Sequence, residues 1–372
     1  MQAWMKKFNE ADQAVYFASA DKQTQLAGFG VADELKNWQQ PSELANWLAQ
    51  QTQLVFGGVP FDEQKQDSVL MNGYFFAPAE TVDLRQVPND SVQTPLQSNA
   101  VLKEDQEVDW VDRMTPTLTT LQREVDKEKV VLGMQTTLQL AHPLDLGQLI
   151  ADLQVKQPNS YHFVLKRGDE AFISATPERL VRLAGQHFET AAVAGSIKRG
   201  ENQAKDAALA SQLWHDPKNR TEHAVVVDTI ANVLSDLATL HYDKEPTLLK
   251  TPQIQHLYTP IQGELAENTS LPELLERLHP TPALGGFPKD WAQAVIKSVE
   301  AQPRGLFAAP IGYLEPNGMG EFVVGIRSMW QKGTEVHLFA GAGILPDSDL
   351  AQEAQEIQLK MTPMKELIEA QQ

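Results

Sequence analysis

Three charged residues near the C-terminal end of the chain share one stripe of a predicted helix. Residues 341–360, GAGILPDSDLAQEAQEIQLK, are a short glycine-containing segment followed by a helical pattern. At about 100° per residue, Glu353, Glu356 and Lys360 fall on one side of that helix. One interpretation is a solvated face on which Glu356 and Lys360 form an i,i+4 ion pair. The other is a cleft wall, because the helix follows an apolar strand and its first turn would face the interior.

A further carboxylate, Glu222 in DPKNRTEHAVVVDTI, lies near the start of an apolar helical run. An acidic residue at a helix start is favoured by the helix dipole, so this position alone indicates no chemistry. Together with Glu353 and Glu356, however, it offers an all-oxygen donor set suited to Mg²⁺, which takes one or two carboxylates plus substrate and water. Zinc suits the set less well, because no histidine pair at i,i+4 accompanies the glutamates.

Composition excludes several classes of partner and chemistry. The 31 basic and 49 acidic residues of the 372-residue chain give a formal charge of −18, which argues against a nucleic acid partner. The absence of cysteine removes disulfides, thiolate nucleophiles and iron–sulfur clusters, and fits a reducing compartment. No window approaches the roughly 18 apolar residues of a spanning helix, and no apolar signal segment follows the first lysines. We therefore expect a cytoplasmic protein with no membrane partner.

The glycine pairs of the sequence do not form a nucleotide fingerprint. GAG at 341–343 and GFG at 28–30 both lack a third glycine and a matching βαβ unit. P-loop, zincin and nucleophile-elbow motifs are absent from the sequence as well. These observations disfavour dinucleotide, P-loop, metalloprotease and α/β-hydrolase chemistry.

The elements that must position these residues alternate in a way that favours an α+β fold. Runs of strands separated by single helices, rather than strict βαβ alternation, are typical of antiparallel sheets. We predict a helix over 35–48 interrupted at Pro41, a linker or long loop over 78–109, a helix beginning at the Thr-Pro pair of 115–128, and a glycine turn at 341–343. Strands are predicted at 129–140, 161–167, 170–175, 179–184, 187–195, 306–314, 321–327 and 335–340, and helices at 201–214, 218–238, 270–278, 288–301 and 349–370.

A series of segments along the chain resembles the chorismate-utilising enzymes, and isochorismate synthases most closely. The resemblance covers roughly residues 110–368 and reaches weakly into the N-terminal third through VFGGVPFD at 55–62. It implies one chorismate-binding domain over 1–372, less recognisable over 1–109, with two packed antiparallel sheets flanked by helices. The segments are KVVL (129–132), ISATPERL (173–180), ETAAVAGSIKRG (189–200), DPKNRTEHAVVV (216–227), QHLYTPIQGEL (255–265), HPTPALGGFP (279–288), GEFVVGIRS (320–328) and FAGAGILPDSDLAQEAQEIQLK (339–360).

The resemblance also implies how the substrate chorismate and a Mg²⁺ ion are held. Glu222 and Glu356 resemble the metal ligands, with Glu353 near the same ion. Arg327 in GIRS resembles the partner of a substrate carboxylate, which a guanidinium can grip with two parallel hydrogen bonds. The resemblance assigns the remaining binding positions to Lys360, the backbone around Ala342 and Gly343, and the pocket turn of Gly195 and Ser196.

Three further residues would carry the reaction that the resemblance implies. Lys129 resembles a general base that activates water for attack at C2 of the chorismate ring, and Glu178 a general acid for the departing C4 hydroxyl. His256 resembles an active-site histidine near that hydroxyl. Burial is the physical requirement, because it would lower the pKa of a lysine base and keep a carboxylic acid protonated, provided that no strong cation lies near the acid.

Alternatives within and outside the family remain. Members that aminate chorismate carry glutamine where Lys129 stands, or a nucleophilic lysine at the position of Ala194, so both positions here favour water. We accordingly expect no glutamine amidotransferase subunit. We also expect a monomer, because no exposed apolar stripe stands out in the sequence. A salicylate synthase, which goes on to eliminate pyruvate, is the alternative enzyme. The alternative without activity is a protein that binds chorismate and catalyses no reaction. Ala191 and Ser196 depart from the usual family pattern, and the product could feed menaquinone or siderophore biosynthesis.

Overall fold

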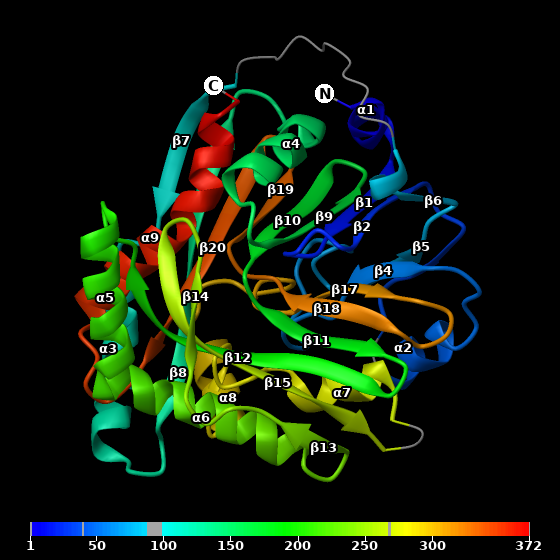
Figure 1. Ribbon diagram of the computed structural model, residues 1–372. Coiled ribbons are helices and arrows are strands. Elements are labelled where there is room, and N and C mark those ends of the chain that lie inside the picture. The colour runs from blue at the N-terminus through cyan, green and yellow to red at the C-terminus, as the bar shows by residue number, and fades with distance from the viewer. Residues whose placement is uncertain (1, 39–40, 88–98, 267–268, 372) are drawn as a thin grey trace.

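Apolar runs along the chain form the strands of two large antiparallel sheets. The computed structural model describes residues 2–38, 41–87, 99–266 and 269–371, and each sheet in it has 10 strands. Figure 1 shows the two sheets one above the other, with helices on their outer sides. The predicted fold class, two packed antiparallel sheets flanked by helices, is confirmed.

The first sheet carries the strand in which Lys129 lies. Along the sheet its strands follow the order β16 (Gly286–Phe287), β8 (Lys129–Leu140), β20 (Glu335–Ile344), β19 (Ser328–Lys332), β10 (Glu170–Thr176), β9 (Tyr161–Arg167), β1 (Gln13–Ala18), β2 (Gln25–Phe29) and β6 (Glu80–Asp83), while β7 (Val101–Gln106) also pairs with β8. Strands from the N-terminal region therefore extend the same sheet as strands from the C-terminal region.

The second sheet carries the strands in which Ser196 and His256 lie. Its order is β13 (Ala238–His241), β15 (Ile254–Leu265), β12 (His187–Lys198), β11 (Arg179–Ala184), β18 (Gly320–Val324), β17 (Pro310–Leu314), β4 (Val55–Gly58), β5 (Tyr74–Ala77) and β3 (Asp33–Leu35), with β14 (Thr247–Lys250) also paired to β15. Here too the N-terminal strands β3 to β5 complete a sheet built largely from later segments.

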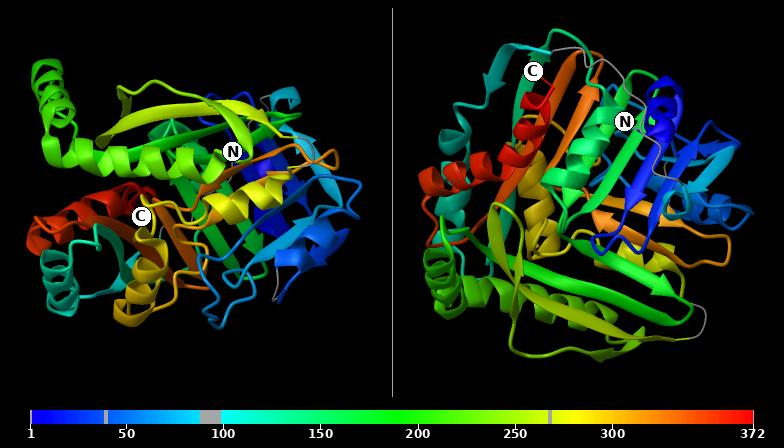
Figure 2. Two further views of the ribbon diagram at one scale, coloured as in Figure 1. Left: turned by 90° about the horizontal axis from the view of Figure 1, so that it is seen from below. Right: turned by 45° about the horizontal axis from the view of Figure 1, so that its top comes forward.

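The helices cover the outer faces and ends of the sheets. They are α1 (Ala3–Glu10), α2 (Pro41–Leu48), α3 (Trp110–Arg123), α4 (Leu146–Lys156), α5 (Gln203–His215), α6 (Pro217–Leu234), α7 (Leu271–Leu278), α8 (Lys289–Val299) and α9 (Leu350–Glu369), with a short 3₁₀ turn at Leu84–Gln86. Helix α9 packs on β20 and α6 on β12, and Figure 2 shows these two helices at the same end of the molecule. None of the helices in the described ranges is long and apolar enough to cross a membrane.

Aromatic side chains join the two sheets. The ring of Phe17 on β1 meets that of Tyr313 on β17 edge-on, with centroids 5.0 Å apart, and both side chains are buried. Phe172 on β10 packs against Gly325, where a Cβ would lie only 3.2 Å from the phenyl ring. Such close contacts exclude water from the interface between the sheets, and this burial is the main source of stability for the layers.

Side-chain caps begin both of the helices that carry the candidate metal ligands. Asp216 accepts a hydrogen bond from the backbone N–H of Asn219 at 2.8 Å, and Pro217 occupies the first turn of α6. Asp349 accepts from the N–H groups of Ala351 and Gln352, at the predicted start of α9. Both caps satisfy donors that have no partner within the helix, so the first turns are held in place.

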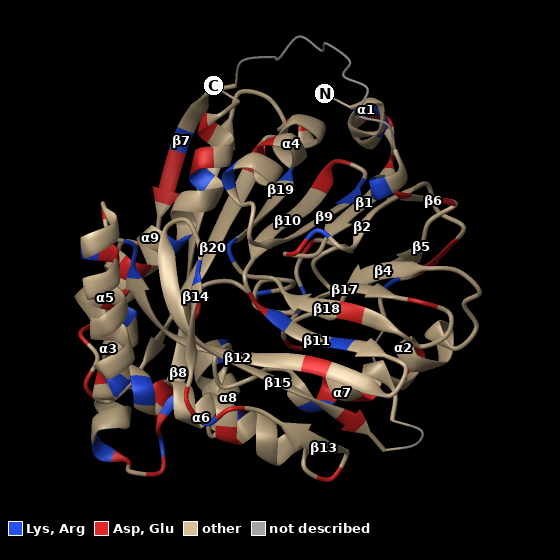
Figure 3. Ribbon diagram, viewed as in Figure 1, with Lys and Arg blue, Asp and Glu red and all other residues tan. Residues whose placement is uncertain are grey.

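Figure 3 shows that charged residues of both signs are scattered along the ribbon. Many of them pair on the surface, for example Lys365 of α9 with Glu104 of β7 at 2.9 Å. Exposed pairs of this kind contribute little to stability. The charges that matter for the site are the buried ones described below.

Several element predictions were wrong. The region of 78–109 predicted as a linker contains strands β6 and β7, and its residues 88–98 lie outside the described residues. Leu35 ends strand β3, and the helix predicted around it begins only at Pro41, which suits a first helical turn.

The helix predicted to begin at the Thr-Pro pair starts earlier, at Trp110, and contains Pro116. Trp110 is buried and donates its indole N–H to the carbonyl of Gly133 at 2.7 Å. This tertiary contact determines where the helix begins, although a proline inside a helix is locally unfavourable.

The predicted glycine turn at 341–343 is instead the last part of strand β20, which continues to Ile344. A Cβ at Gly343 would lie 2.7 Å from Cε of Lys129 and 3.0 Å from Oε1 of Glu222. The glycine is therefore needed for the close approach of two side chains rather than for a turn.

A buried ion pair holds β8 against the loop before β17. Arg304 and Glu300 are joined through Nε and Oε2 at 2.9 Å, and the Arg304 guanidinium also donates to the carbonyls of Val131, at 2.7 Å, and Leu284, at 2.9 Å. Glu300 in turn accepts from the N–H of Gly133 at 2.6 Å. Because the pair bonds backbone groups on both sides, it fixes where β8 lies.

Replacing Arg304 with methionine is expected to lower the free energy of unfolding by about 3–5 kcal/mol, since Glu300 is then left buried without its cation. Lys205→Met, which removes the exposed partner of Glu201, should cost no more than about 1 kcal/mol. Urea denaturation of the two variants and the parent measures both. Equal losses in the two variants would contradict the role given to the buried pair.

Candidate functional site

A cavity of about 250 Å³ lies where helices α6 and α9 meet strands β12, β15 and β20. Its wall is assembled from segments that are far apart in the sequence, including the loop after β10 and the loop after β18. Ten of the twelve residues singled out from the sequence line it: Glu178, Gly195, Ser196, Glu222, His256, Arg327, Gly343, Glu353, Glu356 and Lys360.

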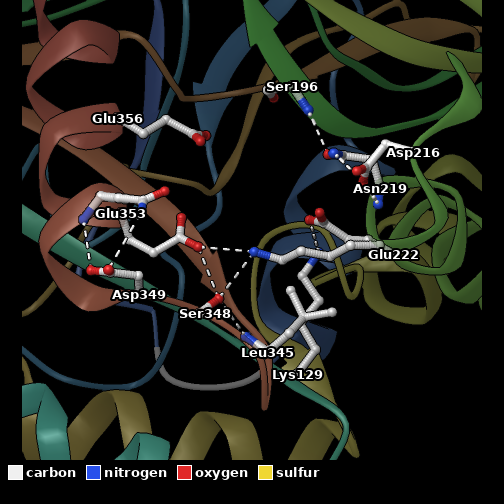
Figure 4. Close-up of polar contacts among 12 residues, drawn as sticks. Lys129, Ser196, Asp216, Asn219, Glu222, Leu345, Ser348, Asp349, Glu353 and Glu356 are labelled. Atoms are coloured by element: carbon white, nitrogen blue, oxygen red, sulfur yellow. Dashed lines mark hydrogen bonds and ion pairs between the residues drawn. The ribbon is translucent and has the colours of Figure 1, made fainter. Parts of the chain in front are cut away.

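Lys129 reaches this wall through an ion pair. Its ammonium nitrogen lies 2.7 Å from Oε1 of Glu222, and only 2% of the lysine is exposed (Figure 4). Burial alone would raise the pKa of Glu222, but the Lys129 ammonium, assisted by Lys360 and Lys218, holds it below its usual value. Glu222 is therefore a carboxylate at neutral pH, and its ion pair with Lys129 connects helix α6 to strand β8.

The other two candidate metal ligands also face lysines. Glu356 pairs with Lys360 at 2.7 Å, which is the i,i+4 ion pair expected for a solvated helix face. Both side chains nevertheless line the cavity. Glu353 accepts from the hydroxyl of Ser348 at 2.8 Å and contacts Nζ of Lys218 at 3.3 Å. Burial raises the pKa of Glu353 against the influence of Lys218 and Ser348.

The three carboxylates do not form a preassembled metal cage. Among the described residues, no three acidic or imidazole side chains lie close enough together to hold an ion. The donor chemistry nevertheless suits Mg²⁺, which binds through one or two carboxylates and keeps several waters. In this structure a lysine ammonium group lies beside each of Glu222, Glu353 and Glu356. The three carboxylates therefore already stabilise positive charge at these positions.

At Glu178, as at Glu353, the effect of burial on the pKa outweighs that of all nearby cations. Burial raises the pKa of Glu178 to about 8, although Lys129, Arg327 and Lys360 act in the opposite direction. The expectation that no strong cation lies near it was wrong, yet the expected protonated state follows from burial alone. Its backbone is held in place, since its N–H donates to Oγ1 of Thr176 at 3.1 Å.

Arg327 is a buried cation with unused hydrogen-bonding capacity. It has a φ of 45°, a left-handed conformation that turns the chain sharply between β18 and β19. Its Nη2 donates to Nε2 of His256 at 2.7 Å, whereas Nη1 has no hydrogen-bond partner among the residues that the structure describes. Burial lowers the pKa of the guanidinium to about 10, so it stays charged at neutral pH. A buried, charged and partly unpaired guanidinium is a strong site for an anion.

His256 is neutral and uses both ring nitrogens. Burial, together with the positive charges of Arg327 and Lys360, lowers its pKa well below the usual value. Because Nε2 accepts from Arg327, the ring proton is on Nδ1, which lies 2.8 Å from the hydroxyl of Ser196. In this arrangement the imidazole orients its two neighbours.

The structure places Ala342 apart from the other candidates. Its side chain is buried, it lies opposite Leu132 in the β20–β8 register, and it does not line the cavity. Instead, the neighbouring Gly341 lines it and accepts from Nζ of Lys360 at 3.0 Å.

Lys218 and Asn219 are among the polar residues of the cavity wall that sequence reasoning missed. Both belong to DPKNRTE, one helical turn before Glu222. The three- and four-residue spacing to Glu222 was the available signal, because it places them on the same side of α6.

Comparison with known proteins places these residues in a family context. The profile of the chorismate binding enzymes matches residues 80–369. The isochorismate synthase MenF of Bacillus subtilis is 40% identical over 257 residues, which cover 69% of this chain and 54% of that protein. The isochorismate synthase EntC of Escherichia coli K12 is 35% identical over 239 residues, or 64% of this chain and 61% of EntC. The match thus spans little more than half the length of these curated relatives.

Solved structures share the fold over almost the whole chain. DhbC from Bacillus anthracis superposes with a TM-score of 0.84 at 26% identity, covering 98% of this chain and 99% of that one. MenF from Escherichia coli gives a TM-score of 0.85 at 24% identity, covering 99% and 91%. Since the family profile spans most of the residues, including every element that lines the cavity, the chain belongs to the family of chorismate binding enzymes.

Proposed function

We propose that this protein is an isochorismate synthase, which adds water at C2 of chorismate and releases the C4 hydroxyl. The observation that carries the proposal is the pairing of a buried acid with a buried amine at one cavity. Glu178 is protonated at neutral pH, and Lys129 lies on another element of the same site. Relatives named as isochorismate synthases support the same reaction.

Substrate binding follows from the cations of the cavity. Chorismate carries two carboxylates, and the unpartnered Nη1 of Arg327 offers one of them a charge-assisted hydrogen bond. Lys360, which lines the same wall, supplies a second positive charge. The apolar side chains of Val131 and Phe307 also line the cavity and can pack against the ring of the substrate. The arrangement suits a ring compound with two carboxylates.

Glu222 and Glu356 would hold a Mg²⁺ ion, with Glu353 beside it. Bound there, the ion would neutralise carboxylates and orient the ring carboxylate of the substrate. The fit rests on the donor set, because three oxygen ligands line one cavity and each already faces a cation in this structure.

The protons balance between two side chains. Lys129 takes a proton from the attacking water, and Glu178 gives a proton to the C4 oxygen, which leaves as water. Lys129 can act as a base only as the neutral amine, so the ammonium group that donates to Glu222 here must first lose a proton to solvent. The two groups come from β8 and from the loop after β10, and so can lie on different sides of the ring.

The nucleophile in this proposal is water, so no amidotransferase partner is needed to supply ammonia. The relatives' names do not agree on a pathway, since one structure is called menaquinone-specific and a curated relative serves salicylate biosynthesis. The proposal accordingly ends at isochorismate.

Product analysis tests the proposal. The protein is incubated with chorismate and Mg²⁺, and the products are separated by chromatography. Isochorismate as the main product is the expected result. Salicylate with pyruvate would identify the alternative salicylate synthase, and unchanged chorismate would indicate a binding protein.

Glu356→Gln is expected to raise the Mg²⁺ concentration for half-maximal activity by about 10- to 100-fold, because an amide is a poorer ligand for a hard dication. Glu369→Gln, an exposed change at the end of the same helix, is the matched control. Activity is titrated against Mg²⁺ for both variants. An unchanged Mg²⁺ requirement in Glu356→Gln would remove this residue from the ligand set.

Lys129→Gln should lower kcat by about 10²-fold or more while the KM for chorismate changes little, because an amide cannot accept a proton from water. Glutamine can still donate to Glu222, so the cavity wall is preserved. Steady-state kinetics give both constants. Turnover at the parent rate would assign the base to another group, with His256 the next to test.

Turnover is expected to fall as the pH rises through about 8, because Glu178 then loses the proton that it must donate. The carboxyl group of Glu178 also makes the free energy of unfolding depend on pH. Its pKa is 4.5 when exposed and about 8 when folded, so its stabilising contribution is present below 4.5 and is lost as the pH rises through 8.

Glu178→Gln should abolish turnover and remove that part of the pH dependence of unfolding. A pH–rate profile and denaturation at several pH values measure the two effects. A variant that retains both the activity and the parent's pH dependence would contradict the assignment.

A further inference from the structure

A chain of hydrogen bonds connects the first turn of α6 to the guanidinium of Arg327. Asn219 donates its side-chain N–H to Asp216 at 2.8 Å, and its Oδ1 accepts from the backbone N–H of Ser196 at 3.2 Å (Figure 4). The Ser196 hydroxyl lies 2.8 Å from Nδ1 of His256, and Nε2 of His256 accepts from Arg327 at 2.7 Å. Every link is a direct contact between neighbouring residues.

The direction of each hydrogen bond follows from chemistry. A carboxylate only accepts, so Asp216 binds the nitrogen end of the Asn219 amide and leaves the oxygen end for Ser196. A guanidinium only donates, so His256 accepts at Nε2 and carries its proton on Nδ1. The Ser196 hydroxyl therefore accepts from the imidazole. Donors and acceptors are therefore consistent along the whole chain of hydrogen bonds, from Asp216 to Arg327.

A bulge in β12 explains why Ser196 needs support from α6. The register between β12 and β15 shifts between Ala194 and Ser196, and Gly195 has a φ of 74°. Such a bulge redirects the side chain that follows it, here the Ser196 hydroxyl opposite His256. A Cβ at Gly195 would lie 3.1 Å from both Cβ and Oδ1 of Asn219. Asn219 thus packs directly on the bulge and bonds its next N–H.

The last hydrogen bond of this series, from Arg327 to His256, determines where Arg327 presents its charge. Because Nη2 is bound to His256, the guanidinium plane is held, and Nη1 has no partner within the described part of the chain. His256 and Arg327 are both buried, so their own rotation is restricted by packing as well. The bulge is held from two sides, by His256 of the paired strand β15 and by Asn219 of helix α6.

We propose that Asn219 is a positioning residue, which acts through Ser196 and His256 to fix the Arg327 guanidinium for a substrate carboxylate. The inference rests on the proposed function, in which Arg327 binds chorismate. It assigns to helix α6 a second task besides carrying Glu222. The acid Glu178 and the amine Lys129 lie on other elements, so the effect of Asn219 is on binding rather than on the chemical step.

Asn219→Ala is expected to raise the KM for chorismate by about three- to tenfold, the effect of losing one hydrogen bond, with kcat within about twofold of the parent. The cap of α6 should persist, because Asp216 accepts from the backbone N–H of residue 219, which every variant keeps. Asn232→Ala, an exposed change in the same helix, is the control and should leave both constants unchanged. Asn219→Ser replaces the alanine variant if that variant does not fold.

A double-mutant cycle with Ser196→Ala tests the route. If Asn219 acts through the Ser196 hydroxyl, then Asn219→Ala adds little to KM once that hydroxyl is absent. Independent effects that multiply would overturn the inference, since they would indicate a direct contact of Asn219 with substrate or a shift of α6. An unchanged KM in Asn219→Ala alone would overturn it as well.

The imidazole gives a readout that does not depend on turnover. Long-range ¹H–¹⁵N spectra of histidine-labelled protein, with His256 assigned through His256→Gln, should show the Nδ1–H tautomer in the parent and a mixture in Asn219→Ala. Failure of the parent to convert chorismate would contradict the proposed function but not the positioning role. An identical His256 signal in parent and Asn219→Ala would contradict the positioning role itself.

Discussion

Buried charges must be paired, and this requirement joins the helices of the cavity to its sheets. An isolated ion in the interior costs several kcal/mol, so each buried carboxylate needs a cation from somewhere in the fold. Lys129 on β8 meets Glu222 on α6, and Lys218 on α6 meets Glu353 on α9. These ion pairs connect the elements that form the walls of the cavity, so the walls are held together by charges as well as by apolar contacts.

Glu178 shows what happens when burial is not compensated. Three cations lie within electrostatic reach, but none forms a hydrogen bond with its carboxyl group among the described contacts, and its pKa rises to about 8. A carboxylic acid that keeps its proton at neutral pH can act as a donor. The same cavity thus holds the ionised carboxylate of Glu222, which suits a cation, and a neutral acid, which suits proton transfer, and the difference lies in their hydrogen-bond partners.

The polar network of the site rests on a rigid frame. The Arg304–Glu300 pair bonds the backbone of β8 near Lys129, and the bulge of β12 is held by Asn219 from α6. Glycines supply the remaining space, as at Gly343, where no side chain could fit beside Lys129 and Glu222. These contacts position charged groups to within the short distances that hydrogen bonding requires.

The sequence by itself determined the fold class, the starts of helices α6 and α9, and most of the polar residues that line the cavity. Local signals were sufficient for these, since Asp216 and Asp349 cap helices through their own neighbours, and the family motifs are contiguous stretches. Only the tertiary structure decided which lysine faces which glutamate, that His256 binds Arg327, and that residues 341–343 are strand rather than turn. It also decided that the helix of Trp110 begins before its proline. These outcomes depend on contacts between residues tens to hundreds of positions apart, whose energies exceed local preferences and leave no periodic pattern in the sequence.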